Sequence, residues 1–228
     1  MKPHGHTSLV RVPAGPVMLY GDLWIPEGAR AIVLFAQGIG SRRRSSRNHR
    51  VARRLQREGF ATMVIDLLTG EEEAVDLQSG TLRFDIGLLS ERLVSITNWL
   101  ASSTRTRHLR TGYFSASTGV AAALVAAAVL PQEVDAVVSI GGRPDLTGPL
   151  LGLVRAPTLF IVGSRDLGVL ELNVESADQL RAETEVEIVP GAGHLFDEPG
   201  ALDRAAILTG GWFERHLLPG AVLIPSPR

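Results

Sequence analysis

A serine stands between small residues where a strand-like run gives way to a helix-like one. Residues 115–119 read Ser-Ala-Ser-Thr-Gly, after an apolar run that ends at Phe114 and at the start of an alanine-rich stretch. A nucleophile raised on such a turn needs small residues two positions before and after it, because strand and helix approach closely there. Ser115 and Gly119 meet that need. The pattern predicts Ser117 as a nucleophile, whereas the alternative role for serine at this point is a helix N-cap.

A serine hydroxyl is a weak nucleophile near neutral pH, so a general base must take its proton and a third group must orient that base. His194 lies in a glycine-containing loop between the last strand-like run and the last helix-like run. Asp166 directly follows an apolar run, where its carboxylate can reach a histidine nitrogen. Asp145, after the preceding run, is the alternative acid. We favour Asp166 because of its place at a strand end, which gives the chain order Ser, Asp, His.

The elements that hold these residues follow from runs of apolar residues along the chain. Two β-rich runs, at 8–12 and 17–25, flank a turn and predict an antiparallel entry. Six further strand-like runs follow, at 31–36, 61–65, 109–114, 134–140, 158–162 and 185–189. Apolar residues at helical spacing predict helices at 48–58, 84–100, 118–130 and 201–216. Strands that alternate with long helices indicate parallel crossovers and an α/β fold of three layers.

The pentad at 115–119 resembles the G-x-S-x-G elbow of α/β-hydrolases, with Ser115 in place of the first glycine. The chain from about residue 8 to 218 resembles the small, lidless dienelactone-hydrolase-like branch of that superfamily. The resemblance implies a mostly parallel twisted sheet with helices on both faces and no large cap domain. It also implies that Ser117, Asp166 and His194 form the catalytic triad.

The same resemblance implies two backbone donors for the oxyanion of a tetrahedral intermediate. One is the N–H of Thr118, which follows the nucleophile and opens a helix. The other is the N–H of Ile39, in the segment Gln37-Gly38-Ile39-Gly40, where the family commonly reads His-Gly-x-Gly. Dienelactone hydrolases themselves use a cysteine nucleophile, and this chain has no cysteine. Their specific activity is therefore not implied.

Composition limits the classes of function. The chain has 228 residues, of which 45% are hydrophobic and 21% charged, with a formal net charge of -1. We expect one globular domain over 1–228, with 219–228 as an extended surface tail. The charge argues against nucleic-acid binding, because no positive excess is available to displace counterions. No run approaches the roughly 18 to 20 apolar residues of a membrane span, so we expect a cytoplasmic protein without a membrane partner.

Five arginines crowd the segment after the predicted oxyanion loop: Arg42, Arg43, Arg44, Arg47 and Arg50. Their proximity suggests an anionic substrate, with Arg43, Arg44 and Arg47 as possible contacts. The alternative is a solvated surface whose charge is balanced by three glutamates at 71–73.

Asn48 is a candidate cap for the helix that follows this segment. The absence of cysteine excludes thiolate metal ligands, and we expect a site without metal or cofactor.

These observations predict a serine hydrolase of small carboxylic esters that works through an acyl-enzyme. Thioesters and lactones are related possible substrates. The alternative is a non-catalytic α/β-hydrolase-like binding or partner module, which the departures at Ser115 and Gln37 favour. The intact set of Ser117, Asp166 and His194 favours the enzyme. Nothing in the sequence indicates the oligomeric state.

Overall fold

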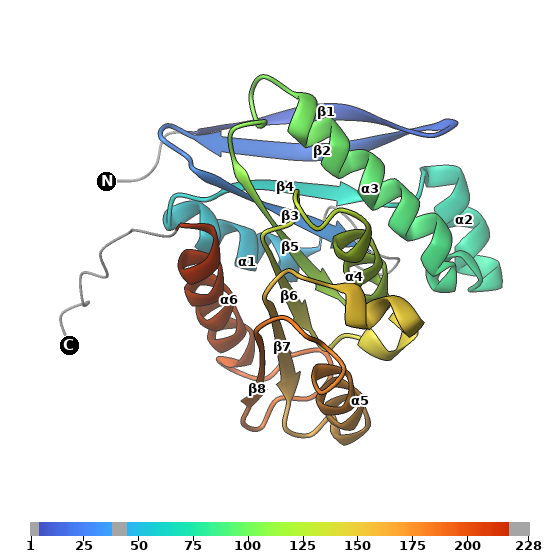
Figure 1. Ribbon diagram of the computed structural model, residues 1–228, viewed down its shortest axis with the longest axis vertical. Coiled ribbons are helices and arrows are strands. Elements are labelled where there is room, and N and C mark those ends of the chain that lie inside the picture. The colour runs from blue at the N-terminus through green and yellow to red at the C-terminus, as the bar shows by residue number, and fades with distance from the viewer. Residues whose placement is uncertain (1–4, 38–44, 219–228) are drawn as a thin grey trace.

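The computed structural model describes residues 5–37 and 45–218, and all of the described strands belong to one sheet of eight. The strands are β1 (Gly5–Ala14), β2 (Val17–Pro26), β3 (Ala31–Gln37), β4 (Ala61–Asp66), β5 (Arg110–Ala116), β6 (Ala136–Ile140), β7 (Thr158–Gly163) and β8 (Thr184–Val189). Their order in the sheet is β1-β2-β4-β3-β5-β6-β7-β8 (Figure 1). The first two strands form an antiparallel hairpin, and β2 is antiparallel to β4. Every pairing from β4 to β8 is parallel.

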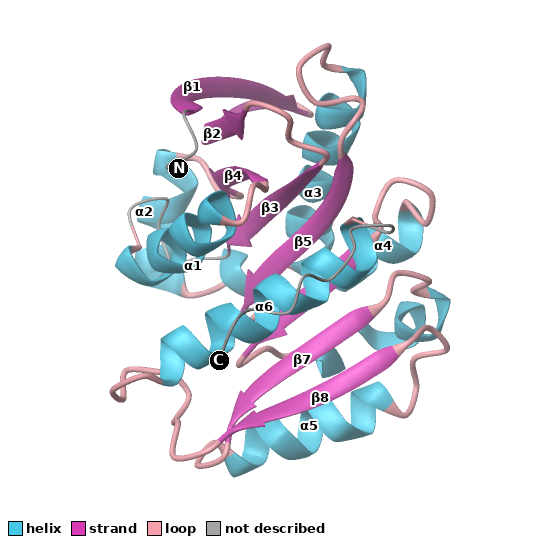
Figure 2. Cartoon of the chain, turned by 90° about the vertical axis from the view of Figure 1, so that its left-hand side faces the viewer, coloured by secondary structure: helices cyan, strands magenta, loops and turns pink. Residues whose placement is uncertain are grey.

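In the described residues, six α-helices and two 3-10 segments lie between the strands or after the last one. The helices are α1 (Ser46–Arg57), α2 (Gly70–Ser79), α3 (Ile86–Ser102), α4 (Gly119–Val129), α5 (Leu167–Ala177) and α6 (Ala201–Leu217). The 3-10 segments are η1 (Leu82–Phe84) and η2 (Pro144–Leu153). Helices α1 and α6 cover one face of the sheet, and α3, α4 and α5 lie on the other (Figures 1 and 2). This is the predicted three-layer α/β-hydrolase fold, and the described residues contain no large cap domain.

The central strands are buried on both faces, which explains their nearly continuous apolar runs. In β3, Val33 and Phe35 pack with the core under α1 and α6, and Ile32 and Leu34 pack with the core under α3 and α4. All four side chains are fully buried. Burial of each such side chain contributes about 1.5 to 3 kcal/mol. The resulting rigid sheet fixes where each strand ends, and with it the loops that carry the candidate site.

One glycine sets how closely α6 approaches the sheet. A Cβ on Gly112 of β5 would lie 2.7 Å from the ring of Phe213 on α6. Such a distance is too short for real atoms, so a side chain here would push α6 away from β5. The glycine therefore allows the part of α6 around Phe213 and Leu217 to pack directly on β5.

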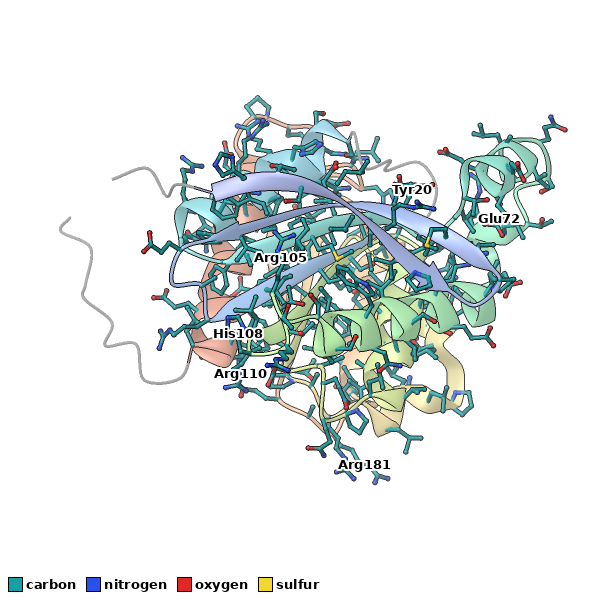
Figure 3. The ribbon with its side chains drawn as sticks, turned by 90° about the horizontal axis from the view of Figure 1, so that it is seen from above. Tyr20, Glu72, Arg105, His108, Arg110 and Arg181 are labelled. Atoms are coloured by element: carbon teal, nitrogen blue, oxygen red, sulfur yellow. The ribbon has the colours of Figure 1, made fainter. Side chains whose placement is uncertain are left out.

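Sequence reasoning placed every strand on an observed strand but missed several helical segments. Helix α2, helix α5 and both 3-10 segments were not predicted. Helix α2 stands out at one side of the molecule, with Glu72 on it (Figure 3). The prediction that Asn48 caps α1 was wrong, because Ser45 is the N-cap and its hydroxyl accepts from the Asn48 N–H. None of the described helices is long and apolar enough to cross a membrane.

Candidate active site

The three predicted triad residues follow the ends of parallel strands. Ser117 comes directly after β5, Asp166 comes three residues after β7, and His194 comes five residues after β8. The carboxyl ends of parallel strands meet at one edge of a sheet, which is where α/β proteins place their ligands. The topology therefore brings residues that are 77 positions apart in sequence to the same edge, from Ser117 to His194.

The backbone at Ser117 is held in a sparsely populated conformation. Its φ is 53°, in the left-handed region that non-glycine residues rarely adopt. Such a conformation costs on the order of 1 to 3 kcal/mol and persists only where the surroundings impose it. Here the Ser117 carbonyl accepts hydrogen bonds from the N–H groups of Val120, at 3.3 Å, and Arg143, at 3.1 Å. The turn between β5 and α4 is thus a strained elbow of the kind that presents a nucleophile.

Ser115, two residues before Ser117, has a structural role. Ser115 is fully buried, and its hydroxyl donates to the carbonyl of Ala36 on the adjacent strand β3, at 2.8 Å. This hydrogen bond links the two strands just before the elbow. Ser115 therefore occupies the first position of the pentad without disturbing the turn, and its hydroxyl is engaged away from the cavity.

A short hydrogen bond joins the histidine to the acid. Nδ1 of His194 lies 2.6 Å from Oδ2 of Asp166. Because a carboxylate accepts at Nδ1, that nitrogen carries the proton in the neutral ring and Nε2 is left as the basic nitrogen. The His194 side chain is 46% exposed and the Asp166 side chain 17% exposed. The pair is thus open on the side of the base, as a general base for an incoming substrate requires.

The rival acid is engaged elsewhere. Asp145 accepts two hydrogen bonds from the guanidinium of Arg143, at 2.8 and 2.7 Å. The hydrogen bond from Arg143 is the main cause that lowers the pKa of the Asp145 carboxyl below its usual value. The structure brings Asp166, and not Asp145, to the imidazole of His194.

A cavity of about 260 Å³ opens at this edge of the sheet, and both Ser117 and His194 line it. Its wall is largely apolar, with Arg47 and Asn48 as further polar residues. The remaining lining residues are Val51, Phe114, Ala116, Ile140, Gly141, Leu195, Phe196 and Leu202. A mostly apolar concave site with a few convergent polar groups is typical of small-molecule binding.

Sequence reasoning missed a contact behind the histidine. Gly141 follows β6 with φ of 52°, and a Cβ there would lie 3.2 Å from the carbonyl oxygen and 3.7 Å from Nδ1 of His194. The Gly141 N–H donates to the carbonyl of Ile161 on β7, at 2.9 Å. The imidazole therefore packs on glycine backbone. The signal in the sequence was the Gly-Gly pair directly after the apolar run that ends at Ile140.

The arginine segment is only partly described. Arg42, Arg43 and Arg44 lie outside the described residues. Arg47 lines the cavity and donates from Nη1 to the carbonyl of Leu195, at 2.9 Å. Arg50 forms a two-point contact with Asp203 on α6, at 2.9 and 2.7 Å.

The acidic residues at 71–73 were the expected counterparts of these arginines. Glu72 instead pairs with Arg92, whose hydrogen bond is the main cause that lowers the pKa of Glu72 to about 2. Arg50 has its carboxylate partner on α6. Of the five arginines, Arg50 thus pairs with Asp203 and not with the glutamates at 71–73.

The predicted oxyanion donors differ in how far the structure describes them. Thr118 lies between Ser117 and the first residue of α4, where helix N–H groups lack partners within the helix. Ile39 lies outside the described residues.

The described residues hold no group of three or more His, Asp or Glu side chains that could bind a metal ion.

Comparisons with known proteins identify the family and the fold of the chain. The model of the dienelactone hydrolase family matches residues 19–207. The crystal structure of a dienelactone hydrolase from Anabaena variabilis ATCC 29413 is 53% identical, with a TM-score of 0.91, over 95% of this chain and 100% of that chain. Est1E from Butyrivibrio proteoclasticus, at 12% identity, shares the fold with a TM-score of 0.74 over 91% of this chain and 98% of that one.

A curated relative carries a different name. A protein of Mycobacterium tuberculosis (strain ATCC 25618 / H37Rv), provisionally named a phosphoribosyl transferase, is 52% identical over 208 residues. The match covers 91% of this chain and 46% of that protein, and a second strain gives the same values. The chain thus spans about half the length of the curated relatives it matches.

Proposed function

This chain belongs to the dienelactone hydrolase family, and we propose that it is a serine hydrolase that cleaves carboxylic esters through an acyl-enzyme. Thioesters and lactones are related substrates under the same proposal. One observation carries it: the hydrogen bond of 2.6 Å between His194 and Asp166 lies beside a cavity that Ser117 also lines. A nucleophile, a base and an orienting acid are the parts that acyl transfer to serine requires.

In the proposed mechanism, Nε2 of His194 takes the proton of the Ser117 hydroxyl as Oγ attacks the substrate carbonyl carbon. The carbonyl π bond breaks, and the resulting oxyanion accepts hydrogen bonds from the N–H of Thr118 and, by resemblance to the family, the N–H of Ile39. Each such donor accounts for about 10² to 10³ in rate. The carbonyl then re-forms as the ester C–O bond breaks, and His194 gives its proton to the leaving alcohol. A water molecule, deprotonated by His194, attacks the acyl carbon; the bond to Oγ breaks, the acid leaves, and His194 returns the proton to Oγ.

Asp166 has an orienting role in this scheme. Its carboxylate holds the Nδ1 proton and stabilises the imidazolium that forms when His194 takes the serine proton. The carboxylate does not itself take that proton. The short contact with Nδ1 also keeps the ring from rotating and leaves Nε2 as the nitrogen that acts on Ser117.

The cavity suggests the form of the substrate. Its apolar wall suits an acyl group of modest size, and Arg47 is placed to bind a carboxylate or phosphate on the same substrate. We extend the anionic contact to Arg43 and Arg44, which lie in the same arginine segment of the sequence. Arg47 can donate to a substrate and to Leu195 at the same time. Its Nη1 donates to the Leu195 carbonyl, and the guanidinium carries five N–H donors in total.

We propose that phosphoribosyl transfer, if the curated relatives catalyse it, takes place in the part of those proteins that this chain does not match. The portion of those proteins that matches this chain is 46% of their length, and the dienelactone hydrolase model covers most of the same region of this chain. The remaining half of the relatives is long enough to hold a separate activity. The name of the relatives therefore gives no reason to replace ester cleavage as the proposed reaction.

A burst experiment tests the proposal. Mixing the protein with a p-nitrophenyl ester in a stopped-flow instrument should release a burst of nitrophenol equal to the enzyme concentration, followed by a slower steady rate, if the acyl-enzyme accumulates. Esters of short and medium acyl chains should be compared. Folded protein without turnover of any ester in the series would favour the binding module.

A further inference from the structure

The loop that carries the acid and the loop that carries the base are joined along their backbones. We call residues 163–166 the acid loop and residues 190–198 the histidine loop. The N–H of Arg165 donates to the carbonyl of Ala192, at 2.9 Å, and the N–H of Gly191 donates to the hydroxyl of Ser164, at 2.8 Å. A Cβ on Gly163 would lie 2.4 Å from the Ala192 carbonyl oxygen. The two loops therefore touch without an intervening side chain at Gly163.

One carboxylate adds a second connection between these loops. Both oxygens of Glu198 lie 3.1 Å from the N–H of Gly193, which donates to them. The same carboxylate forms an ion pair with the guanidinium of Arg165. Gly193 directly precedes His194, and Arg165 directly precedes Asp166. Glu198 thus contacts the chain neighbour of the base and the chain neighbour of the acid at the same time.

This ion pair is poorly suited to a role in stability. The side chains of Arg165 and Glu198 are 60% and 34% exposed, and exposed pairs contribute little to the free energy of unfolding. The hydrogen bond from Gly193 is the main cause that lowers the pKa of Glu198 below its usual value, so the carboxylate stays charged at neutral pH. Stability therefore does not account for Glu198, and its hydrogen bond with the Gly193 N–H indicates another role.

The stretch around His194 needs external support. His194 and Leu195 are exposed, and Phe196 adopts a φ of 55°, which is rare for an aromatic residue. After His194 in the chain, the carbonyl of Leu195 accepts a hydrogen bond from Arg47. Before it, the N–H of Gly193 donates to the carboxylate of Glu198. The two contacts enclose His194 between fixed backbone groups.

We propose that Glu198 is a positioning residue, which through Gly193 and Arg165 holds the imidazole of His194 in register with the carboxylate of Asp166. The inference rests on the proposed catalytic triad. Glu198 does not touch the substrate or the reacting atoms in this account. Its loss should leave substrate binding intact and impair the geometry of the base, and misplacement by about 1 Å can cost on the order of 10² in rate.

The chain offers a matched control. Asp203 on α6 forms an exposed two-point contact with Arg50 on α1, and these side chains are 53% and 58% exposed. This pair also joins a carboxylate to a guanidinium from a distant element. It contacts neither Gly193 nor Arg165. Asp203→Ala therefore removes an equivalent surface pair without removing the proposed support of His194.

The first measurement reads the geometry without any substrate. A histidine that shares its Nδ1 proton with a carboxylate gives a low-field proton resonance, which His194→Gln should remove. We expect this resonance in the wild type and in Asp203→Ala, and its loss or broadening in Glu198→Ala. Glu198→Leu, which keeps the bulk without the acceptors, should behave like Glu198→Ala. Glu198→Gln, which keeps one acceptor for Gly193, should recover part of the signal.

The second measurement is kinetic. Glu198→Ala should lower kcat by about ten- to a hundredfold with KM within about twofold of wild type, whereas Asp203→Ala should change neither. A resonance and a kcat that are unchanged in both Glu198→Ala and Glu198→Leu would overturn the inference. Equal losses in Asp203→Ala would also overturn it. A resonance that responds as expected in a protein without ester turnover would uphold Glu198 and refute the proposed function instead.

Discussion

The serine elbow and the histidine loop hold their residues by different means. Ser117 follows a buried strand, and its neighbours Ser115 and Thr118 are buried, so the position of the nucleophile depends on core packing. His194 lies on an exposed loop, where its position depends on a few polar and backbone contacts. Substitutions of the buried residues beside Ser117 should therefore affect stability more than activity. Substitutions around the histidine loop should affect activity with smaller changes in stability.

The largest expected effect is at the nucleophile. Ser117→Ala should reduce ester turnover by about 10⁶-fold, because no hydroxyl remains to form the acyl-enzyme, while the protein stays folded. Turnover of a p-nitrophenyl ester and a urea unfolding curve measure the two effects. Residual activity within tenfold of wild type would place the nucleophile elsewhere.

The next effect separates the two candidate acids. Asp166→Asn should lower kcat by about 10⁴-fold, because an amide at Nδ1 neither fixes the correct tautomer nor stabilises the imidazolium. Asp145→Asn breaks the contact with Arg143 but leaves the pair of His194 and Asp166 intact, so most activity should remain. Steady-state kinetics of the two variants decides between them. A larger loss in Asp145→Asn would show that the acid has been misassigned.

A smaller effect isolates the glycine behind the histidine. Gly141→Ala and Gly148→Ala both put a side chain on a residue of positive φ, 52° and 63°. Each should cost about 1 to 3 kcal/mol of stability. Only at Gly141 does the new Cβ meet His194, whereas nothing lies within 4 Å at Gly148. We expect kcat to fall by about 10² in Gly141→Ala alone, measured beside unfolding curves for both variants.

A substitution at Ser115 tests whether the serine elbow depends on core packing. Ser115→Ala should keep most of the activity but lower the free energy of unfolding by about 1 to 3 kcal/mol, because a buried hydrogen bond to the Ala36 carbonyl is lost. Urea unfolding and ester kinetics on the same preparation give both values. A loss of activity as large as that of Ser117→Ala would contradict the separate roles assigned to the two serines.

The smallest expected effect concerns substrate charge. Arg47→Gln should reduce kcat/KM for an ester that carries a carboxylate by about tenfold more than for its neutral analogue, because a charge-assisted hydrogen bond is lost. Arg53→Gln, an exposed arginine on the same helix, is the control. The preference should weaken as salt rises, since the site is partly open. Unchanged selectivity in Arg47→Gln would assign this arginine to the support of Leu195 only.

The sequence was sufficient to place the strands and to predict that Ser117, Asp166 and His194 each follow a strand end. Long apolar runs identify buried parallel strands, and small residues around Ser117 identify an elbow, because both signals are local. Helix α2 carries such a local signal too, since Thr69 and Glu72 form a capping box. The hydrophobic pattern of α5 carries no comparable signal.

Contacts between distant loops could not be read in this way. The pairing of Asp145 with Arg143 is local, but nothing in the sequence shows that it excludes Asp145 from the histidine. The bond from Ser115 to Ala36 and the bond from Glu198 to Gly193 both depend on where the backbone lies after folding. Such contacts depend on the register of strands and the paths of loops, which residue types alone do not specify.

The most direct test of the central claim is covalent labelling of the serine. A fluorophosphonate reacts with a serine only when a base has activated its hydroxyl, so it probes Ser117 and His194 together. Treatment of the folded protein, followed by peptide mapping, should give one adduct at Ser117 that is absent from Ser117→Ala and strongly reduced in His194→Ala. An adduct at Ser115, or no adduct on folded protein, would contradict the account.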